Sequence, residues 1–147
     1  MGLQLTDYYT AISEILPNVV SAPVHARFPA TNPQLPYWSF FIEPQAPTYY
    51  GGSITRVLMT ATCFLGRAKI STASAIDVLS QIDSDIESVF QYFKNNLSIS
   101  STSYPNGVQG FLYPVRLNDL RPGIQDVGGG QLAGAQFSLQ WTHQVGG

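Results

Sequence analysis

The chain has few charged residues, a single cysteine and no long apolar run. Charged side chains make up 11% of its 147 residues, against about 25% in a typical soluble domain. A surface with so few charges repels copies of itself only weakly. This composition favours self-association, and a monomer with a polar but uncharged surface is the alternative.

The scarcity of basic residues argues against specific nucleic-acid recognition. The seven Lys and Arg residues are outnumbered by nine Asp and Glu, which gives a net charge of −2, and Arg67 and Lys69 form the only close basic pair. A protein that grips a phosphate backbone needs a basic stripe or patch. No apolar run approaches the roughly 18 residues of a membrane-spanning helix, so we expect no membrane partner.

The length and the apolar content predict one domain covering residues 1–147. Hydrophobic residues make up 44% of the chain, and a chain of this size can bury a core of its own. Cys63 is the single cysteine and cannot form an internal disulfide. We therefore expect the fold to need neither a disulfide nor a metal.

Apolar residues at helical spacing predict two helices. The first runs from Thr6, as N-cap, to Leu16, and Pro17 ends it. The second runs from Ser74, as N-cap, to Phe93. Its apolar stripe advances in steps of three and four and is expected to pack on a sheet. The stripe comprises Ile76, Leu79, Ile82, Ile86, Val89, Phe90 and Phe93.

Four segments have the composition of strands: Tyr37–Glu43, Ile54–Leu65, Gly110–Leu117 and Ala133–Val145. Pro114 favours an edge or bulged position for the third, because proline cannot donate to a ladder. The last strand alternates apolar and polar residues, which is typical of an antiparallel sheet with one buried face.

Proline- and glycine-rich segments separate these elements. We expect an extended connection over Asn18–Pro36, a long hairpin loop over Glu43–Ser53, and another long loop over Asn118–Gln131. The predicted class is α+β, an antiparallel sheet of four or slightly more strands with helices on one face, in the order α-β-β-α-β-β.

The residues that most often carry chemistry do not form a recognisable set. Cys63 alternates into an apolar strand face, where a thiol behaves as a small hydrophobe. His143 continues the buried register of the last strand, and with His25 it offers no zinc-type spacing. Asp83 and Glu87, like Asp85, are expected on the outer, solvated part of the second helix. We therefore predict no catalytic residue, metal ligand or cofactor, and an enzyme that uses Cys63 is the alternative class.

The order and lengths of these elements resemble the tail terminator proteins of long-tailed bacteriophages. The pattern covers nearly the whole chain. It comprises the helix Thr6–Leu16, the aromatic strand Tyr37–Glu43, the strand Ile54–Leu65, the helix Ser74–Phe93 and the Phe-x-Leu-x-Trp-x-His pattern of residues 137–143.

This resemblance implies a virion structural protein without catalytic activity. Such proteins form a homo-oligomeric ring, expected here to be a hexamer, on the last ring of the tail tube protein. One face stops tube polymerisation and the other docks the head through connector or neck proteins. The protein would lie in the neck of the virion, and in the host cytoplasm during assembly. Another neck component, such as a head-completion or connector adaptor protein, is the alternative.

The two long loops carry residue types that are favoured at interface anchors. These are Tyr49 and Tyr50 in the first loop, and Arg121 and Ile124 in the second. We predict that these four residues contact neighbouring subunits or rings, and ordinary mobile loops are the alternative.

Overall fold

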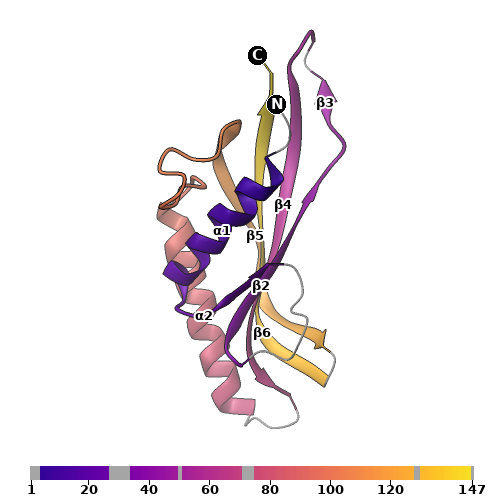
Figure 1. Cartoon of the computed structure of the whole chain (residues 1–147). Coiled ribbons are helices and arrows are strands. Elements are labelled where there is room, and N and C mark those ends of the chain that lie inside the picture. Colours follow the sequence, from indigo (N-terminus) through magenta and orange to yellow (C-terminus); the bar gives the residue numbers. More distant parts are fainter. Residues whose placement is uncertain (1–3, 27–33, 50, 71–74, 128–129, 147) are drawn as a thin grey trace.

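The protein forms one mostly antiparallel sheet with two helices packed on it (Figure 1). The computed structural model describes residues 4–26, 34–49, 51–70, 75–127 and 130–146. The elements in these ranges are α1 (Leu5–Val19), β1 (Val24–Ala26), β2 (Tyr37–Pro44), β3 (Thr48–Tyr49), β4 (Thr55–Lys69), α2 (Ala75–Asn95), β5 (Phe111–Val127) and β6 (Gly130–Val145). The predicted α+β class is confirmed, but the sheet has six strands in the described ranges.

Two long strands, β4 and β6, form the centre of the sheet. The strand order is β1-β2-β4-β6-β5, and β3 pairs with the N-terminal end of β4. Only the short β1 runs parallel to its neighbour among the described strands. The edge strand β5 changes register between Leu112 and Arg116, on either side of Pro114. The predicted edge or bulged position of this proline is thus confirmed.

The core lies between one face of the sheet and both helices. Alternate residues of β2, β4 and β6 point to this face, because successive side chains of a strand point to opposite sides. The largest fully buried side chains include Trp38, Phe40, Phe137 and Trp141. Since both helices contribute to the same apolar cluster, they cover the same face, and the other face of the sheet has no helix over it in the described residues.

His143 is a packed core residue, as predicted. Its side chain is fully buried, and its Nδ1 lies 2.7 Å from the hydroxyl of Tyr8 on α1. The ring of Tyr8 also packs against that of Trp141, with centroids 5.1 Å apart. These contacts fix α1 across the end of β6.

The predicted ends of the first helix are wrong. α1 begins at Leu5, after Gln4 in a left-handed conformation, so Thr6 is inside the helix and is not its N-cap. The helix also continues through Pro17 to Val19. Pro17 has no N–H and so donates no helical bond, but the Val20 N–H still donates to Leu16 O at 3.2 Å and closes the last turn. The N-cap predicted for α2, Ser74, lies outside the described residues.

Three segments predicted as irregular contain strands. β1 lies within Asn18–Pro36, β3 lies within Glu43–Ser53, and β5 and β6 form a hairpin that replaces most of the loop predicted over Asn118–Gln131. β4 also continues past Gly66, through a bulge between Gly66 and Ala68. In each case pairing with a neighbouring strand supplies backbone hydrogen bonds that local composition does not reveal.

Candidate interaction surfaces

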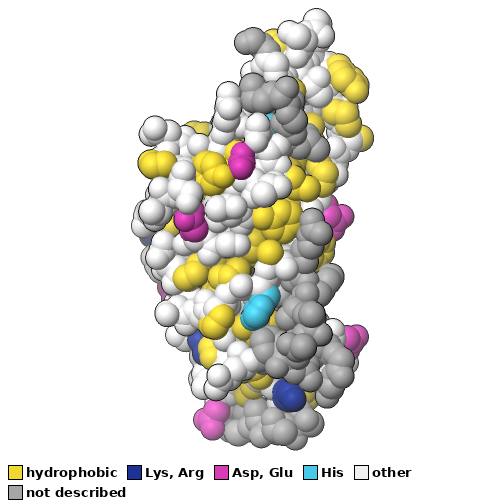
Figure 2. Space-filling model, in the orientation of Figure 1, with side chains coloured by type: hydrophobic (Ala, Val, Ile, Leu, Met, Phe, Trp, Pro, Cys, Tyr) yellow, Lys and Arg dark blue, Asp and Glu magenta, His cyan; other side chains and the backbone are white. Residues whose placement is uncertain are grey.

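One end of the molecule is an exposed projection that we call the arm, residues 43–53, which includes β3. In Figure 1 the arm rises beside the free end of β4, beyond the helices. Every described residue of the arm is exposed, and the side chain of Tyr49 is 75% exposed. Figure 2 shows hydrophobic side chains gathered on this part of the surface. An exposed apolar element of this kind is typical of a contact with another macromolecule.

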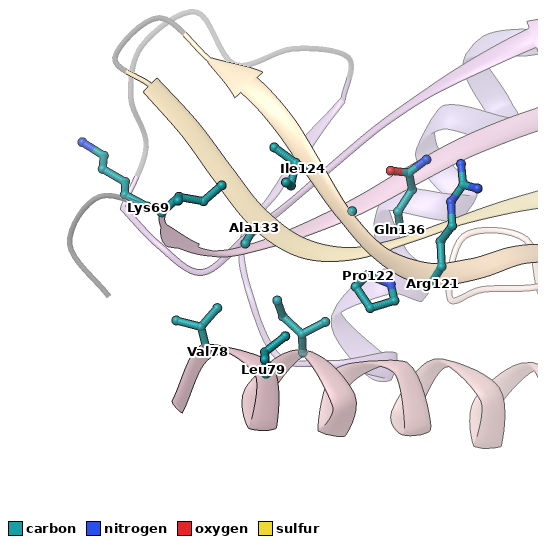
Figure 3. Close-up of a pocket in the computed structure, with 11 residues that line it drawn as sticks. Lys69, Val78, Leu79, Arg121, Pro122, Ile124, Ala133 and Gln136 are labelled. Carbon is teal, nitrogen blue, oxygen red and sulfur yellow. The ribbon is translucent and has the colours of Figure 1, made fainter. Parts of the chain in front are cut away.

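The other end carries an apolar groove of about 600 Å³ between α2 and the β5–β6 hairpin. Figure 3 shows Val78 and Leu79 rising from α2 toward the strands, while Pro122 points from β5 toward the helix. Three side chains at this end are largely exposed: Ile70 (46%), Leu79 (53%) and Ile124 (62%). The groove is the second apolar surface that the described chain leaves open.

The two charged residues that border the groove are both cations. Lys69 lies at the end of β4 and Arg121 lies on β5, and Figure 3 shows the charged ends of both side chains pointing away from α2. No carboxylate lines it among the described residues. The space between α2 and the strands is therefore lined mainly by apolar side chains.

The structure separates the four residues predicted as interface anchors. Arg121 and Ile124 lie on β5 and line the same groove, whereas Tyr49 is on the arm, at the opposite end of β4. Tyr50 lies outside the described residues. The three described anchors therefore belong to two separate surfaces, the arm and the groove.

Sequence reasoning missed the α2 side of the groove. Leu79, which lines the groove, belongs to the stripe predicted to pack on the sheet, but it is 53% exposed; Phe90, on the same stripe but outside the groove, is 47% exposed. The stripe of seven apolar residues is wider than the sheet can cover. That excess width was the available signal, because a helix packed on one sheet needs only about a 100° apolar face.

A buried ion pair fixes α2 against the sheet and thereby shapes the groove. The Arg67 guanidinium on β4 donates from Nε and Nη2 to the two carboxylate oxygens of Asp85, at 2.7 and 2.8 Å. Asp85 is 3% exposed, so its predicted place on the solvated face is wrong. The reason is the partner: a carboxylate can be buried where a guanidinium meets it in a two-pronged pair. Asp83 and Glu87 are exposed, as predicted.

Acidic residues of α1 anchor the segment between α2 and β5. The Glu14 carboxylate accepts hydrogen bonds from the hydroxyls of Ser101 and Ser103, both at 2.9 Å. These hydrogen bonds hold the pKa of Glu14 below its usual value, and the bond from Ser103 has the largest effect. The Tyr104 hydroxyl likewise donates to Asp7 at 2.8 Å. These acids therefore have structural partners.

The uncovered face of the sheet is polar. Its central side chains bond across strands: Asn118 Nδ2 donates to Gln140 Oε1 at 2.7 Å, and Arg56 Nε donates to Gln144 Oε1 at 3.1 Å. β4 and β6 contain no Asp or Glu. Over these strands the face is a layer of amides and hydroxyls with a few arginines, and a small buried apolar cluster of Tyr37, Phe64 and Leu132 interrupts it toward the groove end.

Cys63 and the two histidines are far apart or on opposite faces. Cys63 is fully buried, and burial raises the pKa of its thiol. His143 pairs with Val57, six residues along β4 from Cys63, which is about 20 Å. His25 contacts the ring of Tyr37, on the face without helices, whereas Cys63 faces the helices. These three residues do not form a nucleophile and base.

Among the described residues no cluster of three or more His, Cys, Asp or Glu side chains is arranged to hold a metal ion. In the same part of the chain, no helix has the length and apolar character needed to cross a membrane. A comparison with models of known protein families finds no match. A comparison with curated proteins likewise finds none.

Proposed function

We propose that this protein is a structural component of a bacteriophage virion, a tail terminator. It assembles into a ring, expected to be a hexamer, on the end of the tail tube. There it stops addition of further tube rings and gives the head-side neck proteins a docking surface. In this proposal the protein has no catalytic activity.

One observation carries this proposal: two exposed apolar surfaces, of different composition, lie at opposite ends of one charge-poor body. A contact between two different surfaces repeats head to tail, and it produces a closed ring when the rotation between subunits closes. A body with two such ends suits a ring subunit better than a free monomer, which rarely exposes large apolar patches.

The arrangement of the chemically reactive side chains also supports a non-catalytic role. The single thiol is buried, and burial raises its pKa. His143 lies six residues away along the sheet, and His25 lies on the opposite face. Reactive thiols need an electropositive, partly exposed position. The described residues thus favour a structural protein over an enzyme that uses Cys63.

Light scattering after size exclusion, with and without purified tail tubes, tests the proposal. We expect a ring-sized homo-oligomer, or a monomer that becomes one on tubes, and tubes that no longer elongate. A matched control replaces Tyr113, which is 67% exposed but lies outside the arm and the groove, with Ser and should behave as the wild type. A stable monomer that ignores tubes would contradict the proposal.

Deleting the gene separates a terminator from another neck component. Loss of a terminator gives overlong tails. Loss of a head-completion or connector adaptor protein gives leaky heads with tails of normal length. The second result would replace the terminator proposal with the adaptor alternative.

A further inference from the structure

The charges of this chain are separated between the two layers of the fold. The two helices carry six of the nine Asp and Glu residues but one of the seven Lys and Arg residues, Lys94 in the last turn of α2. Five of the other Lys and Arg residues lie on β4 and β5. The helix layer is therefore acidic, although the whole chain has a net charge of only −2.

On the face of the sheet without helices, β5 presents a basic and polar row. Arg116 pairs with Gln140, and Arg121 pairs with Gln136. These glutamines alternate with the buried residues of β6, so they and the two arginines point away from the helices. Asn118, between the arginines, donates to Gln140 at 2.7 Å. We call Arg116, Asn118 and Arg121 the β5 row; both arginines are exposed, and neither forms an ion pair with a described residue.

Little negative charge opposes the β5 row. Glu43 points to the same face, because it pairs with Thr60, which pairs with Gln140. Three strand spacings, about 14 Å, separate Glu43 from Arg116. Asp119 lies in the bulge of β5, with a left-handed backbone, and pairs with no described residue of β6. With two arginines against one neighbouring acid, the row remains a positive surface.

The exposed flank of α2 presents the opposite charge. Asp83, Glu87 and Phe90 follow one another at steps of four and three, so they form one ridge along the helix. We call these three residues the α2 ridge. Both carboxylates are exposed, and Phe90 is 47% exposed. The Glu87 carboxylate accepts a hydrogen bond from Gln91 at 2.9 Å, and no described cation forms an ion pair with either acid. The ridge thus combines negative charge with a partly uncovered aromatic ring.

We propose that the α2 ridge of one subunit packs against the β5 row of the next, with the two carboxylates of the ridge facing the two arginines of the row. The charges are complementary, and the ring of Phe90 can lie on an arginine side chain, a favourable contact for a guanidinium. The inference rests on the proposed ring and names a contact between its neighbouring subunits; this contact does not use the arm or the groove.

The contact joins different copies of the chain. The ridge cannot reach the row of its own subunit, because α2 and the two arginines lie on opposite faces of the sheet. A contact between two unlike surfaces repeats in one direction and closes into a ring when the rotation between subunits allows it.

Two variants with reversed charges test the contact. Asp83→Arg with Glu87→Arg places cations on both surfaces, and Arg116→Glu with Arg121→Glu places anions on both. Each variant alone should associate roughly tenfold or more weakly than the wild type, because like charges then meet. An equimolar mixture should recover most of the association, since every ridge can then meet a row of opposite sign. A ring with an even number of subunits closes with the two variants alternating, and light scattering after size exclusion measures it.

A matched control changes the net charge equally at other sites. Asp77→Arg with Asp126→Arg alters two exposed acids outside the ridge and the row and should associate as the wild type does. Circular dichroism should confirm that every variant folds, because all the substituted residues are exposed. A mixture that associates no better than its separate components would overturn the pairing of ridge and row.

Salt gives an independent measurement of the same contact. Exposed charges are screened over about 3 Å at 1 M ionic strength but over about 10 Å at 0.1 M. Association of the wild type should therefore weaken between these two salt concentrations. Association that is unchanged or strengthened by salt would show that apolar surfaces hold the subunits together, and the proposed contact would be wrong.

The contact and the terminator function fail in different ways. If rings cap tail tubes and both charge-reversed variants assemble as the wild type does, the contact is wrong and the terminator function stands. If the wild type associates, and the mixture recovers association, but tubes are neither bound nor capped, the contact stands and the terminator function fails. A chain that stays monomeric both in concentrated solution and with tubes would overturn both.

Discussion

The pair of Arg67 and Asp85 gives the sharpest test of how the fold is held together. Replacing Asp85 with Ala leaves the Arg67 guanidinium partly buried without its carboxylate. Removing one partner of a buried pair costs roughly 3–5 kcal/mol. The Asp85 side chain is 4% exposed, but that of Arg67 is 21% exposed and can regain part of its hydration. We therefore expect Asp85→Ala to lower the free energy of unfolding by about 2–3 kcal/mol.

Urea unfolding followed by circular dichroism measures this change, with an unchanged slope as the sign that only stability has altered. The corresponding fall in melting temperature is roughly 4–12 °C for a chain of this length. The exposed Asp83→Ala is the matched control and should stay within about 0.5 kcal/mol of the wild type. If Asp85→Ala costs no more than Asp83→Ala, the assignment of the pair as the clamp on α2 is refuted.

A double replacement separates the charge from the packing. Hydrogen bonds to Asp85 raise the pKa of the Arg67 guanidinium, against the effect of burial, so Arg67 stays charged throughout the accessible pH range. Replacing Arg67 with Met and Asp85 with Leu should recover most of the stability lost in Asp85→Ala, because no unpaired charge remains. A double variant as unstable as the single one would show that the shape of the pair, rather than its charge, holds α2.

Three further outcomes are expected. Tyr8→Phe should lower the free energy of unfolding by roughly 1–3 kcal/mol, because it removes a hydrogen-bond partner of the buried His143; urea unfolding measures this. Cys63→Ala should leave assembly and tube binding intact, and the native thiol should react with a thiol reagent only on unfolding, since it is buried. The amide protection factors of residues 96–110, taken against the intrinsic exchange rate at each pH, should fall in acid, because Glu14 has a folded pKa below its ordinary value of 4.5. Its stabilising bonds are complete above that value and are lost as the pH falls through the lower folded pKa.

Each of these outcomes has a clear contrary result. Unchanged stability in Tyr8→Phe would mean that His143 is satisfied without the hydroxyl. Loss of assembly in Cys63→Ala, with stability retained, would revive the enzyme alternative. Protection factors in residues 96–110 that do not change with pH, or a Glu14→Gln variant that keeps the acid response, would assign the effect to another group.

The sequence predicted the elements whose pattern depends on their own residues. Alternation in β6 follows from one buried face, so the buried position of His143 was correct. The edge position of β5 followed from Pro114, because proline lacks the donor that an inner strand needs. Both inferences depend on local chemistry that tertiary contacts do not override.

The errors arose where a distant partner decides the outcome. Pro122 and Gly123 predicted a loop, yet they pair with Ala135 and Gly134 in a continuous hairpin, because an edge strand tolerates proline. Asp85 was expected on the solvated side of α2. It is buried instead, because Arg67, which is distant in the sequence, pairs with it. The groove was missed for a related reason: the wide apolar stripe of α2 indicates an uncovered side, but it does not reveal that β5 approaches that side.

The long strand β4 joins the arm at Thr55 to the groove at Lys69. Its 15 residues span about 50 Å, and strands of this length carry a right-handed twist that accumulates along the sheet. If successive copies meet through these two ends, the angle between neighbours equals the rotation stored in β4 and its bulge at Gly66–Ala68. The number of subunits per turn would then depend on strand geometry as well as on contact residues, and the bulge that carries Arg67 would set both the local twist and the position of α2.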